Sequence, residues 1–141
     1  MERKNTDQLQ QELMTGNDLD RVLADNDSSF QGYALQERLQ ALFQRREISK
    51  TALARQSGIS EVYLHQVFSG RRTPSRNRLL CLCFGLGASV EEAQDLLRHA
   101  RLAPLYSRDR RDAIVIFGLS HGMSLDEIND KLYAEDADTL Y

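Results

Sequence analysis

The chain has 141 residues, 41% of them hydrophobic, and no tryptophan, which allows one compact core with helical extensions. No stretch approaches the roughly 18 apolar residues of a membrane span, and residues 1–12 lack the apolar core of a secretory signal, so we expect a cytoplasmic protein with no membrane partner. The net charge of -3 argues weakly against a nucleic-acid partner.

The charge is unevenly distributed along the chain. Residues 34–80 carry nine basic and three acidic side chains, whereas residues 1–33 carry three and seven, and residues 81–141 carry six and eleven. A basic segment between acidic flanks is the electrostatic pattern expected of a phosphate-binding surface, although a charge cluster alone is also typical of a solvated face.

Residues 1–33 are predicted to form an N-terminal helical arm and a linker. Leu9 and Leu13 are one helical turn apart, and Val22 lies in a second short apolar pattern. The polar stretch 24–29 then predicts the linker.

Residues 34–101 are predicted to form one domain that begins with a helix near 34–47. The apolar residues of that helix recur at helical spacing, so it buries one stripe against the rest of the domain. These residues are Leu35, Leu39, Leu42 and Phe43.

Residues 48–74 predict two helices joined by a tight turn. Ser49 is suited to cap a helix over 51–56, Gly58 supplies the left-handed conformation that follows a helix end, and Ser60 caps a second helix over 61–68. The second helix is predicted to bury Leu64, Val67 and Phe68 and to leave Glu61, Val62, His65 and Gln66 on or near its other side.

Two further helices complete the predicted domain. After Pro74 we expect a helix over 76–86 that Gly85 and Gly87 weaken and end, followed by a helix from the capping box Ser89–Glu92 to about Arg101. The first of them contains Cys81 and Cys83, whose spacing suits neither a metal site nor a disulfide and predicts buried thiols.

Residues 102–141 are predicted to form a C-terminal helical hairpin. Pro104 interrupts the chain before a helix over 108–119, and a second capping box, Ser124–Glu127, opens a helix over 125–133. The apolar run 114–119 could also be a strand, but the charged residues that lead into it favour a helix.

The turn region resembles the helix-turn-helix of the XRE family, the phage repressor and Cro-like transcriptional regulators, over about residues 35–87. This resemblance implies an all-α fold with a five-helix, lambda-repressor-like domain, short N-terminal helices and a C-terminal helical hairpin. Residues 103–106 and 110–113 also resemble the C-terminal region of uncharacterised family members from Gram-positive bacteria. The residues that match the family pattern are Leu53, Ala54, Gly58, Ile59, Ser60, Leu64, Gly70 and Pro74.

The resemblance implies that helix 61–68 lies in the major groove of double-stranded DNA. Gln66 can pair with adenine, Val62 can contact a thymine methyl group and Glu61 can accept from cytosine. Lys50 stands where the family often has Gln, which favours a phosphate contact there. The predicted base-reading residues are Glu61, Val62 and Gln66 with Tyr63 and His65 beside them, and the predicted backbone contacts are Lys50, Ser60, Arg71 and Arg72.

We therefore predict a sequence-specific transcriptional regulator that binds DNA as a homodimer, because one recognition helix reads only a few base pairs. Residues 102–141 are the first candidate for the dimer surface, although packing on the core explains the run 114–119 equally well, and the stripe of Leu9 and Leu13 is the second. The alternative is a protein-interaction module, an adaptor or antitoxin-like partner, on a helix-turn-helix scaffold that does not bind DNA. Glu61, Val62 and the net charge of -3 motivate it.

No phosphate loop, nucleophile elbow or metalloprotease motif is present in the sequence. His99 and His121 stand apart from one another and from other residues at metal-ligand spacing. We therefore expect no catalytic residues, no metal site and no cofactor.

Overall fold

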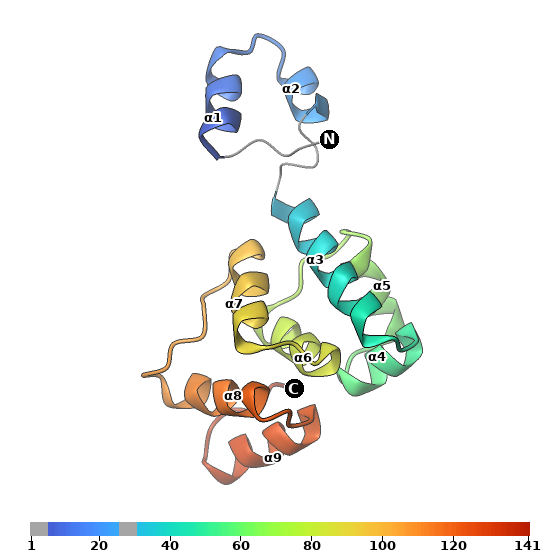
Figure 1. The fold of residues 1–141 in the computed structure, drawn as a ribbon, viewed down its shortest axis with the longest axis vertical. Helices are drawn as coiled ribbons and strands as arrows, with labels where there is room; N and C mark the ends of the chain where they lie inside the picture. The colour runs from blue at the N-terminus through green and yellow to red at the C-terminus, as the bar shows by residue number, and fades with distance from the viewer. Residues whose placement is uncertain (1–5, 26–30) are drawn as a thin grey trace.

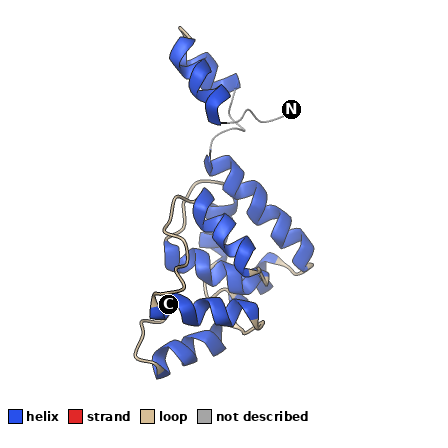
Figure 2. Cartoon of the chain, turned by 60° about the vertical axis from the view of Figure 1, so that its left-hand side comes forward, coloured by secondary structure: helices blue, strands red, loops and turns tan. Residues whose placement is uncertain are grey.

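The computed structural model describes residues 6–25 and 31–141, and within them the chain forms nine helices and no strand (Figures 1 and 2). The all-α class is therefore confirmed. None of the described helices is both long and apolar enough to cross a membrane. The helices are α1 (Thr6–Thr15), α2 (Leu19–Asp25), α3 (Gln31–Arg46), α4 (Lys50–Gln56), α5 (Glu61–Phe68), α6 (Arg76–Leu86), α7 (Val90–His99), α8 (Arg110–Ser120) and α9 (Leu125–Ala134).

Helices α3 to α7 surround a common apolar core, with α6 in the middle (Figure 1). Helix α6 is buried along almost its whole length, because α4, α7 and α9 pack against it. Helix α3 lies against α7 and α5, and its predicted stripe points inward. The five-helix domain predicted from the sequence is thus present.

The observed helix ends differ from the predicted ends where a local conformation intervenes. Helix α7 stops at His99, two residues early, because Arg101 adopts a left-handed conformation with φ 58°. Helix α8 begins at Arg110 because Asp109 caps it, accepting a hydrogen bond of 2.9 Å from the Asp112 backbone N–H. The strand alternative for 114–119 is wrong, since this run lies inside α8.

Gly85 has a different role from the predicted one. Gly87 ends α6 with φ 63°, as expected, but Gly85 lies within the helix. A Cβ at Gly85 would come within 2.0 Å of the Ser57 hydroxyl oxygen at the end of α4. Gly85 therefore allows α4 and α6 to approach closely and does not weaken the helix end.

The short apolar patterns of the N-terminal arm form two helices, α1 and α2, which contact each other. Val22 is buried in this pair, whereas Leu13 is exposed. Most of the predicted linker, residues 26–29, lies outside the described residues.

Cys81 and Cys83 are free and buried, which confirms the prediction of buried thiols. Burial raises the pKa of Cys81 to about 11 and that of Cys83 to about 12. Both thiols are therefore protonated at neutral pH and unreactive as nucleophiles.

Helices α8 and α9 form the C-terminal hairpin, which packs on α6 and α7 (Figure 1). Val115 and Leu119 are buried against the core, and Phe117 is exposed. The chain then returns to the domain, where the Leu140 backbone N–H donates a 2.7 Å hydrogen bond to the Asn129 amide oxygen and Tyr141 donates one of 2.6 Å to Asp126. Packing on the core thus accounts for most of the apolar run.

A bidentate ion pair ties the hairpin to the domain. Arg76 donates to both carboxylate oxygens of Asp112, at 3.2 and 2.9 Å, and also to the carbonyl oxygens of Ala103 and Pro104. Asp112 is nearly buried and additionally accepts from the Tyr106 backbone N–H. Because the carboxylate holds both the guanidinium and the connecting loop, it fixes the start of α8.

Replacing Asp112 by Ala should lower the free energy of unfolding by about 3 kcal/mol, because the change leaves a largely buried guanidinium without its counter-ion. Arg110→Ala is the matched control on the same helix, since it removes an exposed ion pair to Glu135 and should cost much less than Asp112→Ala. Urea unfolding followed by circular dichroism measures both. Equal losses in the two variants would contradict the assigned role of Asp112.

Candidate nucleic-acid interface

The turn between α4 and α5 has the geometry that the sequence predicted. Gly58 adopts φ 62°, and the Ile59 backbone N–H donates back to the Ala54 carbonyl at 3.1 Å, which closes the end of α4. The Ser60 hydroxyl accepts from the Tyr63 backbone N–H at 3.1 Å and so caps α5. These local bonds fix the direction in which α5 leaves the turn.

Helix α5 buries one side and presents the other. Leu64 and Val67 are buried, and the Phe68 ring meets Phe43 of α3 edge-on with the centroids 5.6 Å apart. We call the outward side the α5 face: Glu61, Val62 and His65 are exposed there, and Tyr63 and Gln66 are half-buried. All five predicted base-reading residues therefore lie on this helix outside the core.

Tyr63 lies beneath two guanidinium groups on the α5 face. The guanidinium carbon of Arg78 lies 4.7 Å from the Tyr63 ring centroid, and that of Arg72 lies 5.4 Å from it. Both distances are within the range of cation–π attraction. The ring therefore holds two positive charges beside the helix.

Arg72 also orients Gln66, because its Nε donates a 3.0 Å hydrogen bond to the Gln66 amide oxygen. A guanidinium has donors only, so the amide oxygen must face it and the amide N–H₂ points elsewhere. One lone pair of the oxygen remains available. The predicted reader Gln66 is thus fixed by a predicted phosphate-binding residue.

Arg78 was not among the predicted site residues, because it lies in the helix after the turn region and not in the predicted recognition helix. It lies in the first turn of α6, a turn with no acidic residue. Positive charge near a helix N-terminus opposes the helix dipole, so an arginine at this position costs stability unless another interaction supports it. An arginine at this unfavourable position, a few residues after Arg71 and Arg72, was the sequence signal that could have identified Arg78 as a site residue.

The other predicted contacts are arranged around the same helix. Arg71 lines a shallow hollow of about 370 Å³ together with Val62, His65 and Gln66. The Lys50 ammonium, by contrast, lies 5.5 Å from the Phe68 ring centroid, near the C-terminal end of α5. Lys50 is therefore separated along the helix from Ser60 at its start.

The acidic segments neutralise part of the basic segment. Arg38 pairs with Asp95 at 2.7 Å, and Arg45 pairs with Glu92 at 2.6 Å, both across to α7. The hydrogen bond from Arg45 lowers the pKa of Glu92 below its ordinary value. Together with the pair Arg76–Asp112, these ion pairs neutralise the arginines that face α7 and α8.

The positive charge around α5 has no such neutralisation. Among the residues that the structure describes, no carboxylate pairs with Lys50, Arg71, Arg72 or Arg78. Glu61 is the acidic residue of this helix, and the dipole at the N-terminus of α5 favours its charge. Arg71, Arg72 and Arg78 therefore lie beside the α5 face without a carboxylate partner, and Lys50 lies at the C-terminal end of α5.

The described part of the chain contains no group of three or more His, Cys, Asp or Glu side chains that could hold a metal ion. His99 and His121 each place Nδ1 2.8 Å from a backbone carbonyl oxygen four residues earlier. Hydrogen bonding to the backbone accounts for both rings.

Comparison with known proteins identifies the domain. Residues 34–96 match a family model described as a helix-turn-helix domain. This segment begins in α3 and ends within α7, so it contains the whole turn region and α5. No curated protein and no solved structure matches the chain significantly.

Two glycines with similar positive φ allow the cost of backbone strain to be separated from the cost of crowding by neighbouring side chains. Gly58 and Gly122 both have positive φ, 62° and 65°, but a Cβ at Gly58 would also lie 3.0 Å from the Tyr141 ring, whereas Gly122 has open space. Gly122→Ala should cost about 1 kcal/mol of unfolding free energy from strain, and Gly58→Ala about 2 to 3 kcal/mol because overpacking is added. Thermal unfolding of both variants measures the difference.

Part of the excess comes from the Tyr141 ring and part from Leu125, whose Cδ2 would lie 3.2 Å from the same Cβ. Measured against Tyr141→Ala alone, Gly58→Ala should therefore cost less than in the natural sequence but more than Gly122→Ala. An equal cost of Gly58→Ala in the presence and in the absence of the Tyr141 ring would show that the ring does not crowd this position.

Proposed function

We propose that this protein, whose residues 34–96 match a helix-turn-helix domain, is a sequence-specific DNA-binding transcriptional regulator of the XRE type. The observation that carries the proposal is the cluster of unneutralised cations around the exposed face of α5. We further propose that it is a bacterial, cytoplasmic and non-enzymatic regulator that acts as a homodimer. Residues 34–101 are the DNA-binding domain in this proposal, and residues 1–33 and 102–141 are its accessory arm and hairpin.

In the proposed complex α5 lies in the major groove, with its N-terminal half at the base edges. The Gln66 amide can donate to adenine N7 with its N–H₂ and accept from N6 with the lone pair that Arg72 leaves free. Val62 is 68% exposed, which suits contact with a thymine methyl group. Glu61 can accept from cytosine N4 at the start of the helix.

Phosphate contacts position the helix in this account. Ser60, Arg71 and Arg72 flank α5, and the Tyr63 ring supports Arg72 and adds Arg78 to the set. Lys50 approaches from the end of the helix near Phe68, where it can reach a different phosphate from those near Ser60.

The dimer surface has a narrower candidate than the sequence suggested. Packing buries Val115 and Leu119 and leaves Phe117 55% exposed on the hairpin, stacked on His121 with the ring centroids 3.9 Å apart. Phe117 is the exposed residue of the run 114–119, and with His121 it forms a surface available to a second copy of the chain.

Selection from random double-stranded DNA should enrich one operator, and affinity for it should fall steeply with salt as phosphate contacts release counter-ions. Gln66→Ala should cost about 1 to 3 kcal/mol of binding free energy and relax the base preference at one position. Arg71→Ala should instead weaken binding to all sequences and lower the salt slope by about one. Arg98→Ala, on the exposed surface of α7, is the control that should change neither.

The absence of any enriched site at low and at physiological salt would refute DNA recognition. It would favour the alternative, a protein-interaction module, for which the exposed Val62 is the supporting observation. A partner that binds stoichiometrically and is indifferent to Arg71 and Arg72 would then be expected.

A further inference from the structure

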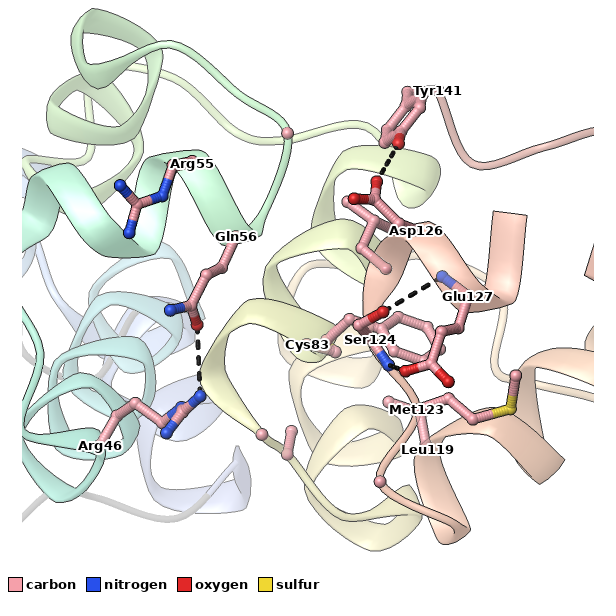
Figure 3. A pocket seen from close by; sticks show the side chains of 16 residues that line it. Arg46, Arg55, Gln56, Cys83, Leu119, Met123, Ser124, Asp126, Glu127 and Tyr141 are labelled. Atoms are coloured by element: carbon pink, nitrogen blue, oxygen red, sulfur yellow. Dashed lines mark hydrogen bonds between the residues drawn. The ribbon is translucent and has the colours of Figure 1, made fainter. Parts of the chain in front are cut away.

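An open groove of about 750 Å³ separates the helix-turn-helix from the C-terminal hairpin (Figure 3). Its walls come from segments far apart in the sequence: the ends of α3 and α4 on one side, and the start of α9 with Tyr141 on the other. A volume of this size lies within the range of small-molecule sites in proteins. None of the residues proposed to contact DNA lines it.

The two walls carry opposite charges. Arg46, Arg55 and Gln56 line one wall, and Asp126 and Glu127 line the other (Figure 3). The cations and the carboxylates do not pair with one another across the groove.

The carboxylates have protein partners of their own. Asp126 accepts a hydrogen bond from the Tyr141 hydroxyl at 2.6 Å, and Glu127 accepts one from the Ser124 backbone N–H at 3.0 Å (Figure 3). Both donors are neutral, so the carboxylates keep their charge, but their need for hydrogen bonds is partly met within the hairpin.

The cations lack a negative partner within the described part of the chain. Arg46 donates to the Gln56 amide oxygen at 3.2 Å and to the Gly85 carbonyl at 3.4 Å, which orients its guanidinium at the groove. These bonds use two of its five N–H donors, and both acceptors are neutral. Arg55 adds a second unpaired charge to the same wall.

The surface between the walls includes apolar side chains beside the polar ones. Phe84 of α6, Leu119 of α8 and Met123 of the α8–α9 turn line it. A ligand with one charged group and an apolar portion can use both kinds of surface.

We propose that this groove binds a small organic monocarboxylate, whose carboxylate pairs with Arg46 and whose apolar body lies on Phe84, Leu119 and Met123. A guanidinium with free N–H donors recognises a carboxylate through charge-assisted hydrogen bonds. A second carboxylate at the far end of the ligand meets Asp126 and Glu127 and is repelled, so the groove selects monoanions over dianions. An alkylamine lacks the group that satisfies Arg46 and binds weakly.

Fluorescence titration of the full chain with 1-anilinonaphthalene-8-sulfonate tests the site, since this probe carries one anionic group on an apolar body. We expect saturable binding of one probe per chain, displacement by octanoate, and weaker displacement by octanedioate and octylamine at equal concentrations. Octanoate should also raise the midpoint of cooperative thermal unfolding, because it binds the native state.

Arg46→Gln should weaken octanoate binding about tenfold, through loss of a charge-assisted hydrogen bond. Arg108→Gln is the matched control: it removes an exposed arginine without a side-chain partner in the described structure, away from the groove, and should leave binding unchanged. Asp126→Asn should narrow the gap between octanedioate and octanoate. Asp126→Asn therefore tests the site even if Arg46→Gln fails to fold.

Equal displacement by octylamine and octanoate would overturn the proposal, as would unchanged octanoate affinity in Arg46→Gln. An octanedioate affinity that Asp126→Asn leaves unaltered would also contradict it. Because no arm of the experiment contains DNA, its failure is distinct from failure of the DNA-binding proposal.

Discussion

The close contact between the end of α4 and the middle of α6 is the constraint on which the arrangement of the domain depends. Ser57 is fully buried there, and Gly85 has no side chain that could hold the helices apart. Because α6 is the central helix of the core, this contact fixes α4, and the capped turn at Gly58 and Ser60 then fixes α5. The outward direction of the α5 face therefore follows from packing on its opposite side.

Pairing of charges, more than their total, distinguishes one side of the domain from another. Acidic residues of α7 and α8 neutralise Arg38, Arg45 and Arg76. The first two pairs join α3 to α7 within the domain, and the third joins the domain to the hairpin. The arginines beside α5 rest on Tyr63 and bond to Gln66, which are neutral groups. No carboxylate neutralises them, and this is why a chain with a net charge of -3 still presents a cationic face.

Helix caps and turns, which depend on residues close together in the sequence, could be predicted. Features that depend on contacts between helices could not. Caps such as Ser60 and the turn glycine Gly58 act within a few residues, so the helices of the turn were predicted to within a residue or two. Gly85 is required because the end of α4 packs against it, and Arg78 is held by the Tyr63 ring of α5. Neither contact could be derived from residues nearby in the sequence. The groove was missed for the same reason, since its walls are joined only in the fold.

The central claim, that the α5 face and the cations around it contact DNA, is tested most directly by nuclear magnetic resonance. The protein, labelled with ¹⁵N, is titrated with a double-stranded DNA oligonucleotide at low salt, and the backbone amide shifts are followed. The account predicts that the largest changes fall on residues 60–66, 71–72 and 78, that they diminish as salt is added, and that α8 and α9 change little. Shifts concentrated on α8 and α9, or none at low salt, would contradict it.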